Sequence, residues 1–210
     1  MPLFKFKPMR VSSGGEPFRF LDPGLLIDHD FELIPPEARW VDEVLAACRH
    51  PQSLNEEPSL GQTTRNHLIE FLAACPRGLQ KAEPEAGIVP TYHFWMRDHR
   101  PDAPLAIVGG IGLRIGRTPD LELYFGHVGY HVYPPSRGRH LAERACRLLM
   151  PLAARHGINP LWITCNPENI ASKRTCERLG AMLVETVPVP PDHPLYQRGE
   201  RMKCRYRLDV

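Results

Sequence analysis

The stretch Pro134–Gly157, PPSRGRHLAERACRLLMPLAARHG, joins a loop rich in proline, glycine and arginine to a long amphipathic helix. Gly138 permits backbone conformations that a Cβ would hinder, so successive amide groups of this turn can converge on an anion. The helix adds the positive end of its dipole, and Arg137 and Arg139 add charge-assisted donors. The stretch therefore predicts a pyrophosphate site. A basic loop with solvated arginines is the alternative interpretation.

Two common phosphate-binding motifs do not occur in this loop. It lacks the G-x-x-x-x-G-K-[ST] string of the P-loop NTPases. It also lacks the G-x-G-x-x-G fingerprint that opens a dinucleotide-binding helix and precedes an acidic residue by about 20 positions. The predicted phosphate ligand therefore belongs to neither of these two classes.

The composition is that of a globular protein without a strong electrostatic bias. The chain has 210 residues, of which 42% are hydrophobic and 24% charged, and its formal net charge is +2. The length fits one domain with a short extension, and the small net charge argues against nucleic-acid binding. We find no signal peptide and no apolar run of about 18 residues. We therefore expect a cytoplasmic protein with no membrane or nucleic-acid partner.

The six cysteines show no metal-binding pattern. They stand at positions 48, 75, 146, 165, 176 and 204, without a CxxC pair or a CxxC…HxxxH spacing. We therefore expect no metal site. Because the cysteines lie in apolar periodic segments, buried free thiols are the favoured interpretation, and disulfides are the alternative.

Outward from the opening stretch, strands and helices can be assigned along most of the chain. Besides the helix of that stretch, helices are expected over residues 37–50, 63–78 and 167–180. Strands are expected over residues 31–36, 88–97, 104–116, 123–133, 160–166, 181–187 and 201–208, and loops over 51–62 and 188–200. This order predicts a mixed α/β (α+β) fold with a central twisted sheet of about six to seven strands flanked by about four helices. We place an N-terminal extension at residues 1–30 and the domain at residues 31–210.

The loop and its neighbours resemble the GCN5-related N-acetyltransferase (GNAT) superfamily. The cofactor loop of that family reads [Q/R]-x-x-G-x-[G/A], and residues 137–142 match its first and last positions, with His140 in place of the usual glycine. Asn169, Ser172 and Gly180 match positions of the family's N-x-x-[A/S]-x-x-x-Y-x-x-x-G signature. The resemblance is strong from about Leu105 to Val187 and weaker over residues 31–100.

This resemblance implies an acetyl-CoA site in a sheet that splays between its fourth and fifth strands. The pyrophosphate is expected on the backbone of Arg137, Gly138, Arg139, His140, Leu141 and Ala142. The pantetheine arm is expected along His131, Val132 and Tyr133, with Asn169 and Ser172 on its other flank. A Cβ at His140 fits such a loop if its φ is negative, and the imidazole adds a second phosphate donor.

The implied reaction is direct attack of a primary amine on the thioester in a ternary complex. Holding the two substrates side by side supplies much of the rate enhancement. The backbone amide of His131 is the candidate that polarises the thioester carbonyl. His127 stands where some members of the family carry a catalytic glutamate, and an imidazole suits proton transfer near neutral pH. Glu122 is the second candidate base. The alternatives are a polar core role for His127 and a solvated charge for Glu122.

The proton donor to the leaving thiolate is the weakest part of the resemblance. The family often carries a tyrosine seven residues after the asparagine, and here Cys176 takes that position. A thiol with a pKa near 8.5 can serve as an acid, but a buried inert cysteine is the alternative. Tyr196, in the proline-rich segment before the final strand, is a second candidate.

The sequence leaves the amine acceptor open. Glu56 and Glu57 can attract a cationic amine, or form a solvated acidic loop. The alternating aromatic residues of the segment 88–97 can line an acceptor pocket or fill a core; they are Tyr92, Phe94 and Trp95. Segment 188–200 is also expected near the acceptor. A non-catalytic acyl-CoA-binding sensor or scaffold is the alternative function, and the chain is expected to be a monomer or a homodimer.

Overall fold

The computed structural model describes residues 18–83 and 87–210, and it has the mixed α/β fold that the sequence predicts. The larger sheet has six strands in the order β1-β2-β4-β5-β6, with β3 paired to β4, and all its pairs are antiparallel. These strands are β1 (Ile27–Asp28), β2 (Phe31–Ile34), β3 (Leu79–Gln80), β4 (Thr91–Asp98), β5 (Ile107–Arg114) and β6 (Val128–Val132).

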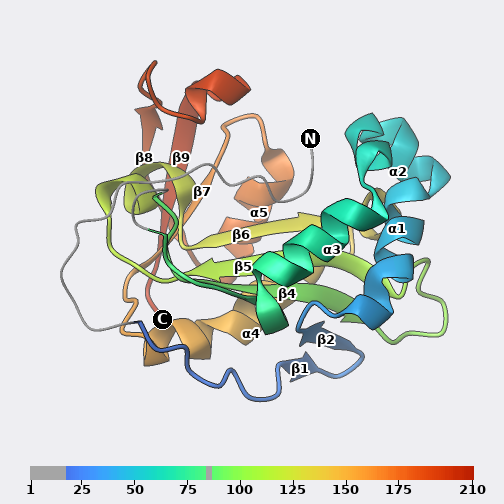
Figure 1. Cartoon of the computed structure of the whole chain (residues 1–210). Helices are drawn as coiled ribbons and strands as arrows, with labels where there is room; N and C mark the ends of the chain where they lie inside the picture. The colour runs from blue at the N-terminus through green and yellow to red at the C-terminus, as the bar shows by residue number, and fades with distance from the viewer. Residues whose placement is uncertain (1–17, 84–86) are drawn as a thin grey trace.

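A second sheet contains the last three strands in the order β7-β9-β8. They are β7 (Leu161–Cys165), β8 (Met182–Pro188) and β9 (Met202–Leu208), and β9 pairs antiparallel with both neighbours. Strand β7 pairs with β9 and forms no ladder with β6. The two sheets are joined at His127, whose backbone N–H donates to the Trp162 carbonyl at 2.7 Å. Beyond this contact β6 and β7 diverge, which is the splay that the resemblance implies (Figure 1).

Helices cover both faces of the larger sheet (Figure 1). They are α1 (Val41–Arg49), α2 (Pro51–Glu56), α3 (Arg65–Ala74), α4 (Leu141–Arg155) and α5 (Ile170–Leu179). Helix α1 packs against Trp95, Ile107 and Tyr133 on one face. Helix α4 packs on the other face, where Leu149 and Leu152 are buried against the opposite side chains of the same strands. Alternate side chains of β4 therefore pack into two different cores, one on each face of the sheet.

Two segments differ from their predicted structure. Residues 51–62, expected to be a loop, form α2 and a 3₁₀ helix, because Pro51 and Pro58 occupy first-turn positions where the missing N–H costs nothing. The expected strand 123–133 is shorter, because residues 121–125 form one turn of π-helix that ends at Gly126, whose φ is +68°. This turn ends immediately before β6 and the splay.

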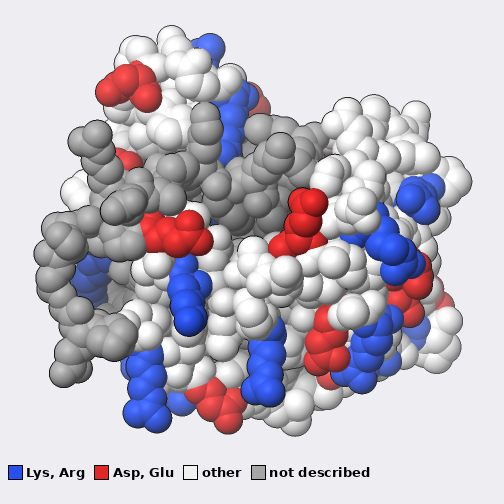
Figure 2. All heavy atoms as spheres, in the orientation of Figure 1, with Lys and Arg blue, Asp and Glu red and all other residues white. Residues whose placement is uncertain are grey.

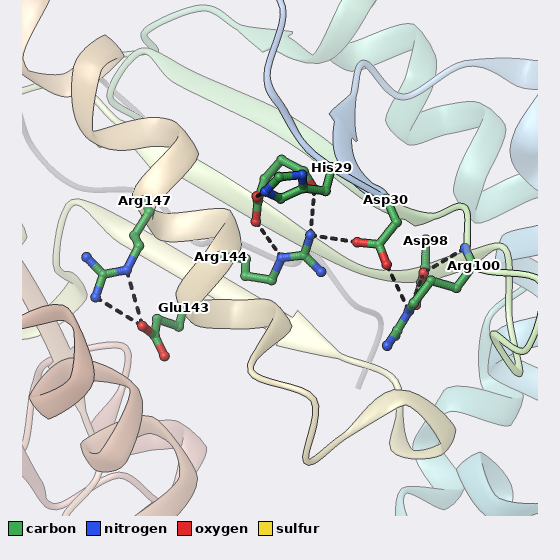
Figure 3. Close-up of polar contacts among 8 residues, drawn as sticks. His29, Asp30, Asp98, Arg100, Glu143, Arg144 and Arg147 are labelled. Atoms are coloured by element: carbon green, nitrogen blue, oxygen red, sulfur yellow. Dashed lines mark hydrogen bonds and ion pairs between the residues drawn. The ribbon is translucent and has the colours of Figure 1, made fainter.

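The described part of the expected N-terminal extension is integrated into the domain. Strand β1 pairs with β2 at the edge of the larger sheet. Arg144 of α4 bonds Asp28 and also Asp30, the latter at 2.8 Å, so the β1–β2 hairpin is clamped to the helix (Figure 3). Asp30 also approaches Arg100, which pairs with Asp98 (Figure 3). Residues 1–17 of the extension lie outside the described residues, and the boundary at residue 30 stays a prediction.

Candidate functional site

The loop before α4 has the backbone conformation of an anion-binding turn. Gly138 has a φ of +80°, a backbone conformation that L side chains rarely adopt. A Cβ at this position would meet no neighbouring atom, so the backbone conformation alone favours glycine here. His140, the residue before α4, has a φ of +58°, so the negative φ at which a Cβ was expected to fit this loop is not what the structure shows. It holds the left-handed conformation that a glycine would hold at this place. The first amides of α4 are therefore presented to the cavity beside them.

Two cavities meet between this loop and the open edge of β6. The larger, which we call the loop cavity, has a volume of about 600 Å³ and is lined by residues 136–142 together with parts of β6 and α5. The smaller, which we call the β7 cavity, has a volume of about 300 Å³ and is lined by Thr164 and Cys165 of β7 and by segments around β6 and β9. Both cavities share Tyr130, Asn169 and Ser172. A ligand can therefore extend from the loop into the splay between the sheets.

The loop cavity is lined by residues with hydrogen-bond donors that have no acceptor among the described residues. The Ser136 hydroxyl and one guanidinium nitrogen of Arg139 are buried without a hydrogen-bond partner among the described residues. Arg174 and Arg178 of α5 also line this cavity, and the sequence analysis did not identify them. A buried donor without a partner costs about 1–3 kcal/mol, so an anion in this cavity would be stabilised by both groups. The donor set fits the phosphates of coenzyme A.

Arg137 is held by acidic side chains of α2 and the residue after it. Its Nε donates to the Val132 carbonyl at 3.1 Å, one of its terminal nitrogens pairs with Glu56 at 3.2 Å, and the other pairs with Glu57. Glu57 also accepts from His131 at 2.9 Å. The bond from His131, followed by that from Arg137, lowers the pKa of Glu57 to about 2. Glu56 and Glu57 therefore lie at the phosphate loop, and this corrects their expected place beside the acceptor.

The register of β6 decides which of its amides face the splay. His127 accepts from the Arg114 amide at 2.7 Å, and Tyr133 donates to the Val108 carbonyl at 2.9 Å, so the odd-numbered residues between them face β5. His131 is opposite Gly110 in this ladder, and its amide is not available to a thioester, which corrects the sequence prediction. By alternation, the amides of Tyr130 and Val132 point toward the splay.

Tyr133 lies in the core below the loop. Its side chain is 3% exposed, and its hydroxyl lies 3.8 Å from the Cys48 sulfur of α1. Since its N–H is bonded to β5, its backbone amide is not free for a pantetheine arm. Of the three residues expected along that arm, only Val132 therefore offers its amide to the splay.

Asn169 and Ser172 line both cavities. The Asn169 side chain caps α5 by accepting from the Ser172 amide at 3.0 Å. The Ser172 hydroxyl is 2.8 Å from the hydroxyl of Tyr130, which reaches across from β6. Burial raises the pKa of Tyr130 well above its ordinary value, so the phenol stays protonated and can donate. Sequence reasoning missed Tyr130, although its place on an alternating strand beside the loop was a usable signal.

His127 is built into the junction between the sheets. It is 1% exposed; its Nε2 lies 3.0 Å from the Gly116 carbonyl, and its Nδ1 accepts from the Trp162 amide at 2.9 Å. Burial, as the largest cause, lowers its pKa to about 4. Both nitrogens of the neutral ring are engaged with the backbone, so the geometry gives His127 a structural role and does not fit a base.

The other candidate catalytic residues lie outside both cavities. Cys176 is fully buried in the core, and burial raises the pKa of its thiol well above the ordinary value. Glu122 lies on the π-helical turn, where its carbonyl accepts from Arg205 at 3.0 Å. Tyr196 stacks beneath Arg201, whose guanidinium carbon is 3.7 Å from the ring centre. None of the three lines either cavity, and this geometry does not support the expected acid and base roles.

Of the residues expected around the acceptor, some are buried in the cores and others line the β7 cavity. Tyr92, Phe94 and Trp95 are buried in the two cores and line neither cavity, so of the two alternatives they fill a core. From segment 188–200, however, Leu195 and Arg198 line the β7 cavity. That segment therefore contributes to the site as expected.

The described residues contain neither a candidate metal site nor a candidate membrane-spanning helix. No group of three or more potential metal ligands occurs in residues 18–83 and 87–210. None of the helices in these ranges is both long and apolar enough to cross a membrane. On the face shown in Figure 2, basic and acidic side chains are interspersed along its lower part. All six cysteines are free and buried, so the favoured interpretation of them is confirmed.

Comparisons with known proteins give one matching sequence family and several similar folds. The sequence model of the acetyltransferase (GNAT) domain matches residues 31–182. The fold is similar to the microcin C7 self immunity acetyltransferase MccE in complex with acetyl-CoA and AMP, with a TM-score of 0.63, 13% identity, and coverage of 87% of this chain and 94% of that one. It is also similar to a GCN5-related N-acetyltransferase from Brucella melitensis, with a TM-score of 0.61, 17% identity, and coverage of 92% and 81%.

A third similar structure is RimL, a ribosomal L7/L12 alpha-N-protein acetyltransferase in complex with coenzyme A. Its TM-score is 0.59 at 15% identity, and the match covers 89% of this chain and 98% of that one. At these identities the likeness concerns the fold alone. A search of curated proteins finds no match.

Proposed function

We propose a function for this chain on the premise that it belongs to the GNAT acetyltransferase family, whose model matches residues 31–182. The chain transfers an acetyl group from acetyl-CoA to a primary amine by direct attack in a ternary complex. The observation that carries this proposal is the pair of adjoining cavities, which extend from the anion-binding turn at Gly138 to the splay between β6 and β7.

The loop cavity is the proposed site of the coenzyme A phosphates. The backbone from Arg137 to Ala142 and the positive end of α4 would hold the pyrophosphate, with the unpartnered donors of Ser136 and Arg139 beside it. Arg174 would add a charge-assisted contact from α5. For Arg137 to join them, its ion pairs with Glu56 and Glu57 must loosen, because its guanidinium nitrogens are engaged there.

The open edge of β6 is the proposed place of the pantetheine arm and the thioester. The amides of Tyr130 and Val132 point to this side and are the candidates that bind the arm and polarise the thioester carbonyl. Tyr130 lines both cavities, and its hydroxyl, which lies 2.8 Å from the Ser172 hydroxyl, is our candidate donor to the leaving thiolate. It takes over the role that was expected of Cys176. The free amine attacks the thioester carbon, the C–S bond breaks, the Tyr130 hydroxyl protonates the leaving thiolate, and the proton released by the amine restores the phenol. The chemistry is then mainly positioning of the two substrates.

A non-catalytic acyl-CoA-binding module is the second candidate. The observation that favours it is the burial of His127 and Cys176, which removes the expected base and acid from the cavities. Coenzyme A release from acetyl-CoA, measured over a panel of primary amines, separates the two functions. Amine-dependent release supports the transferase, whereas tight acetyl-CoA binding without release on any amine supports the module.

The site assignment is tested separately by calorimetry. We expect Arg137→Ala to weaken acetyl-CoA binding by about threefold to tenfold, since a partly exposed cation contributes about 1 kcal/mol to an anion site. Arg65→Ala is the matched control, because Arg65 is an exposed arginine that also pairs with an acid, Asp42, and lines neither cavity. Equal acetyl-CoA affinity in both variants would remove Arg137 from the proposed site.

A further inference from the structure

We infer that Arg174 and Arg178 of α5 hold the phosphate on the ribose of the cofactor, and that they let the protein distinguish coenzyme A from its 3′-dephospho form. This inference rests on the proposed binding of acetyl-CoA in the loop cavity. It makes two residues that the sequence analysis did not identify the determinants of cofactor specificity.

One face of α5 forms a wall of the loop cavity. The side chains that line the cavity follow the helical spacing i, i+3, i+4 and i+7, and they are Ala171, Arg174, Thr175 and Arg178. The two arginines therefore lie on the same face of the helix and border the same cavity.

The guanidinium groups of these two arginines are not engaged by the protein. Arg174 and Arg178 are exposed, and within residues 18–83 and 87–210 their side chains make no hydrogen bond or ion pair. Because they are like charges four residues apart on one helix face, they repel each other. A phosphate dianion bound between them would remove this repulsion and accept hydrogen bonds from both.

The charges on the wall of the loop cavity exceed what the pyrophosphate requires. The cavity is lined by four arginines and a single carboxylate, Glu57, which pairs with Arg137. Four arginines less one leave three without an acidic partner among the described residues, and they are Arg139, Arg174 and Arg178. The pyrophosphate already has the backbone amides of the loop as donors, so a further phosphate is the group that these charges would balance.

The dipole of α5 does not explain both arginines. A cation stabilises the last turn of a helix, which is where Arg178 lies. This end of α5 is already covered by Arg147 of α4, which donates to the Arg178 carbonyl at 2.7 Å and also pairs with Glu143 (Figure 3). Arg174 lies one turn earlier, away from the helix end. A ligand in the cavity therefore accounts for both residues, whereas the dipole would account for Arg178 alone.

The order of residues along α5 matches the order of groups along the cofactor. Ser172 lines both cavities and bonds Tyr130, where the thioester is proposed. Arg174 and Arg178 line the loop cavity but not the β7 cavity. Arg178 lies about 9 Å beyond Ser172 along the helix axis, because each residue of an α-helix rises about 1.5 Å. In coenzyme A the ribose phosphate lies beyond the pyrophosphate, at the end of the molecule opposite the sulfur.

Calorimetry with acetyl-CoA and with acetyl-3′-dephospho-CoA tests the inference. We expect the parent protein to bind acetyl-CoA about tenfold more tightly than the dephospho form, since a hydrogen bond between charged groups contributes about that much. The double variant Arg174→Gln/Arg178→Gln should lose most of this preference, because its affinity for acetyl-CoA falls while its affinity for the dephospho form changes much less. Lys173→Gln is the matched control, since it removes a positive charge from the same helix at a residue that lines neither cavity.

The outcomes separate this inference from the proposed function. The inference is overturned if the parent binds both forms equally, or if the double variant keeps the same preference as Lys173→Gln. Equal binding of both forms with amine-dependent release of coenzyme A overturns the inference and leaves the transferase standing. A preference that the double variant loses, without release on any amine, supports the inference and favours the acyl-CoA-binding module. Failure of the parent to bind either form overturns both.

Discussion

Among single residues, Tyr130 tests the proposed chemistry most directly. Its hydroxyl bonds the Ser172 hydroxyl at 2.8 Å, and Tyr130 lines both cavities. We expect Tyr130→Phe to lower kcat by about a hundredfold or more, because a positioned proton donor typically contributes about 10²–10⁴-fold to the rate. Acetyl-CoA affinity should change little, since the ring and the backbone amide remain. Steady-state kinetics together with calorimetry give both quantities.

Two variants serve as controls for Tyr130→Phe. Tyr196→Phe removes a phenol that lines neither cavity and should leave kcat unchanged. Cys176→Ala removes a core thiol, so it should lower stability while the folded protein keeps its turnover. A kcat for Tyr130→Phe within about twofold of the parent would show that the phenol only packs against α5.

Some site residues were predictable because backbone geometry alone selects them. Gly138 was identified by the need for a positive φ, and Asn169 by the resemblance of its helix start. The role of His127 was not predictable, because it depends on the Gly116 carbonyl and the Trp162 amide, which tertiary packing brings to its ring. Tyr130 was missed for the same reason, since its partner lies 42 residues further along the chain.

At the scale of elements, we predict opposite effects on acetyl-CoA binding for substitutions at two nearby positions of the loop before α4. Gly138 and His140 both hold a positive φ. We expect Gly138→Val to weaken acetyl-CoA binding by about tenfold or more, because a β-branched residue is strained there. We expect His140→Gly to bind at least as well as the parent, because glycine adopts this conformation without strain. Calorimetry on both variants measures the effect, and urea unfolding checks that they fold.

The two variants distinguish the backbone from the imidazole. If His140→Gly loses acetyl-CoA affinity while Gly138→Val keeps it, the loop acts through the histidine side chain and the backbone assignment is wrong. The conformation at His140 also shows what the sequence could not supply. The pattern identified a helix and a loop, but the sign of φ at a non-glycine residue depends on how the loop is packed between α2 and α5.

The arrangement of elements was predictable in order and less so in pairing. Periodicity identified the six strands from β4 to β9 and four of the helices around them, α1, α3, α4 and α5. It could not show that β7 turns away from β6 to pair with β9, because both pairings bury the same alternating side chains. Two hydrogen bonds between His127 and the Trp162 backbone join the two sheets where the ladder is missing.

At the scale of the whole molecule, stability should fall on mild acidification. Burial lowers the pKa of His127 to about 4 and that of His93 to about 3, and it also lowers the pKa values of His156 and His193. An unfolded histidine has a pKa near 6.5, so between about pH 6.5 and pH 4 the unfolded chain binds more protons than the folded one. The stability that these neutral rings contribute is therefore present above pH 6.5 and is lost as the pH falls toward 4.

Urea unfolding at pH 7 and pH 5 measures how much of this loss of stability comes from His127. Each strongly shifted histidine should lower the free energy of unfolding by about 1–2 kcal/mol over this interval. His127→Ala should be less stable than the parent at pH 7, and the gap should narrow at pH 5, because the variant has no ring to protonate on unfolding. His29→Asn, at a histidine whose side chain is 92% exposed, should keep the parent's pH dependence. The prediction fails if the difference in free energy of unfolding between His127→Ala and the parent is the same at pH 7 and pH 5. In that case the folded protein does not require a neutral ring at His127.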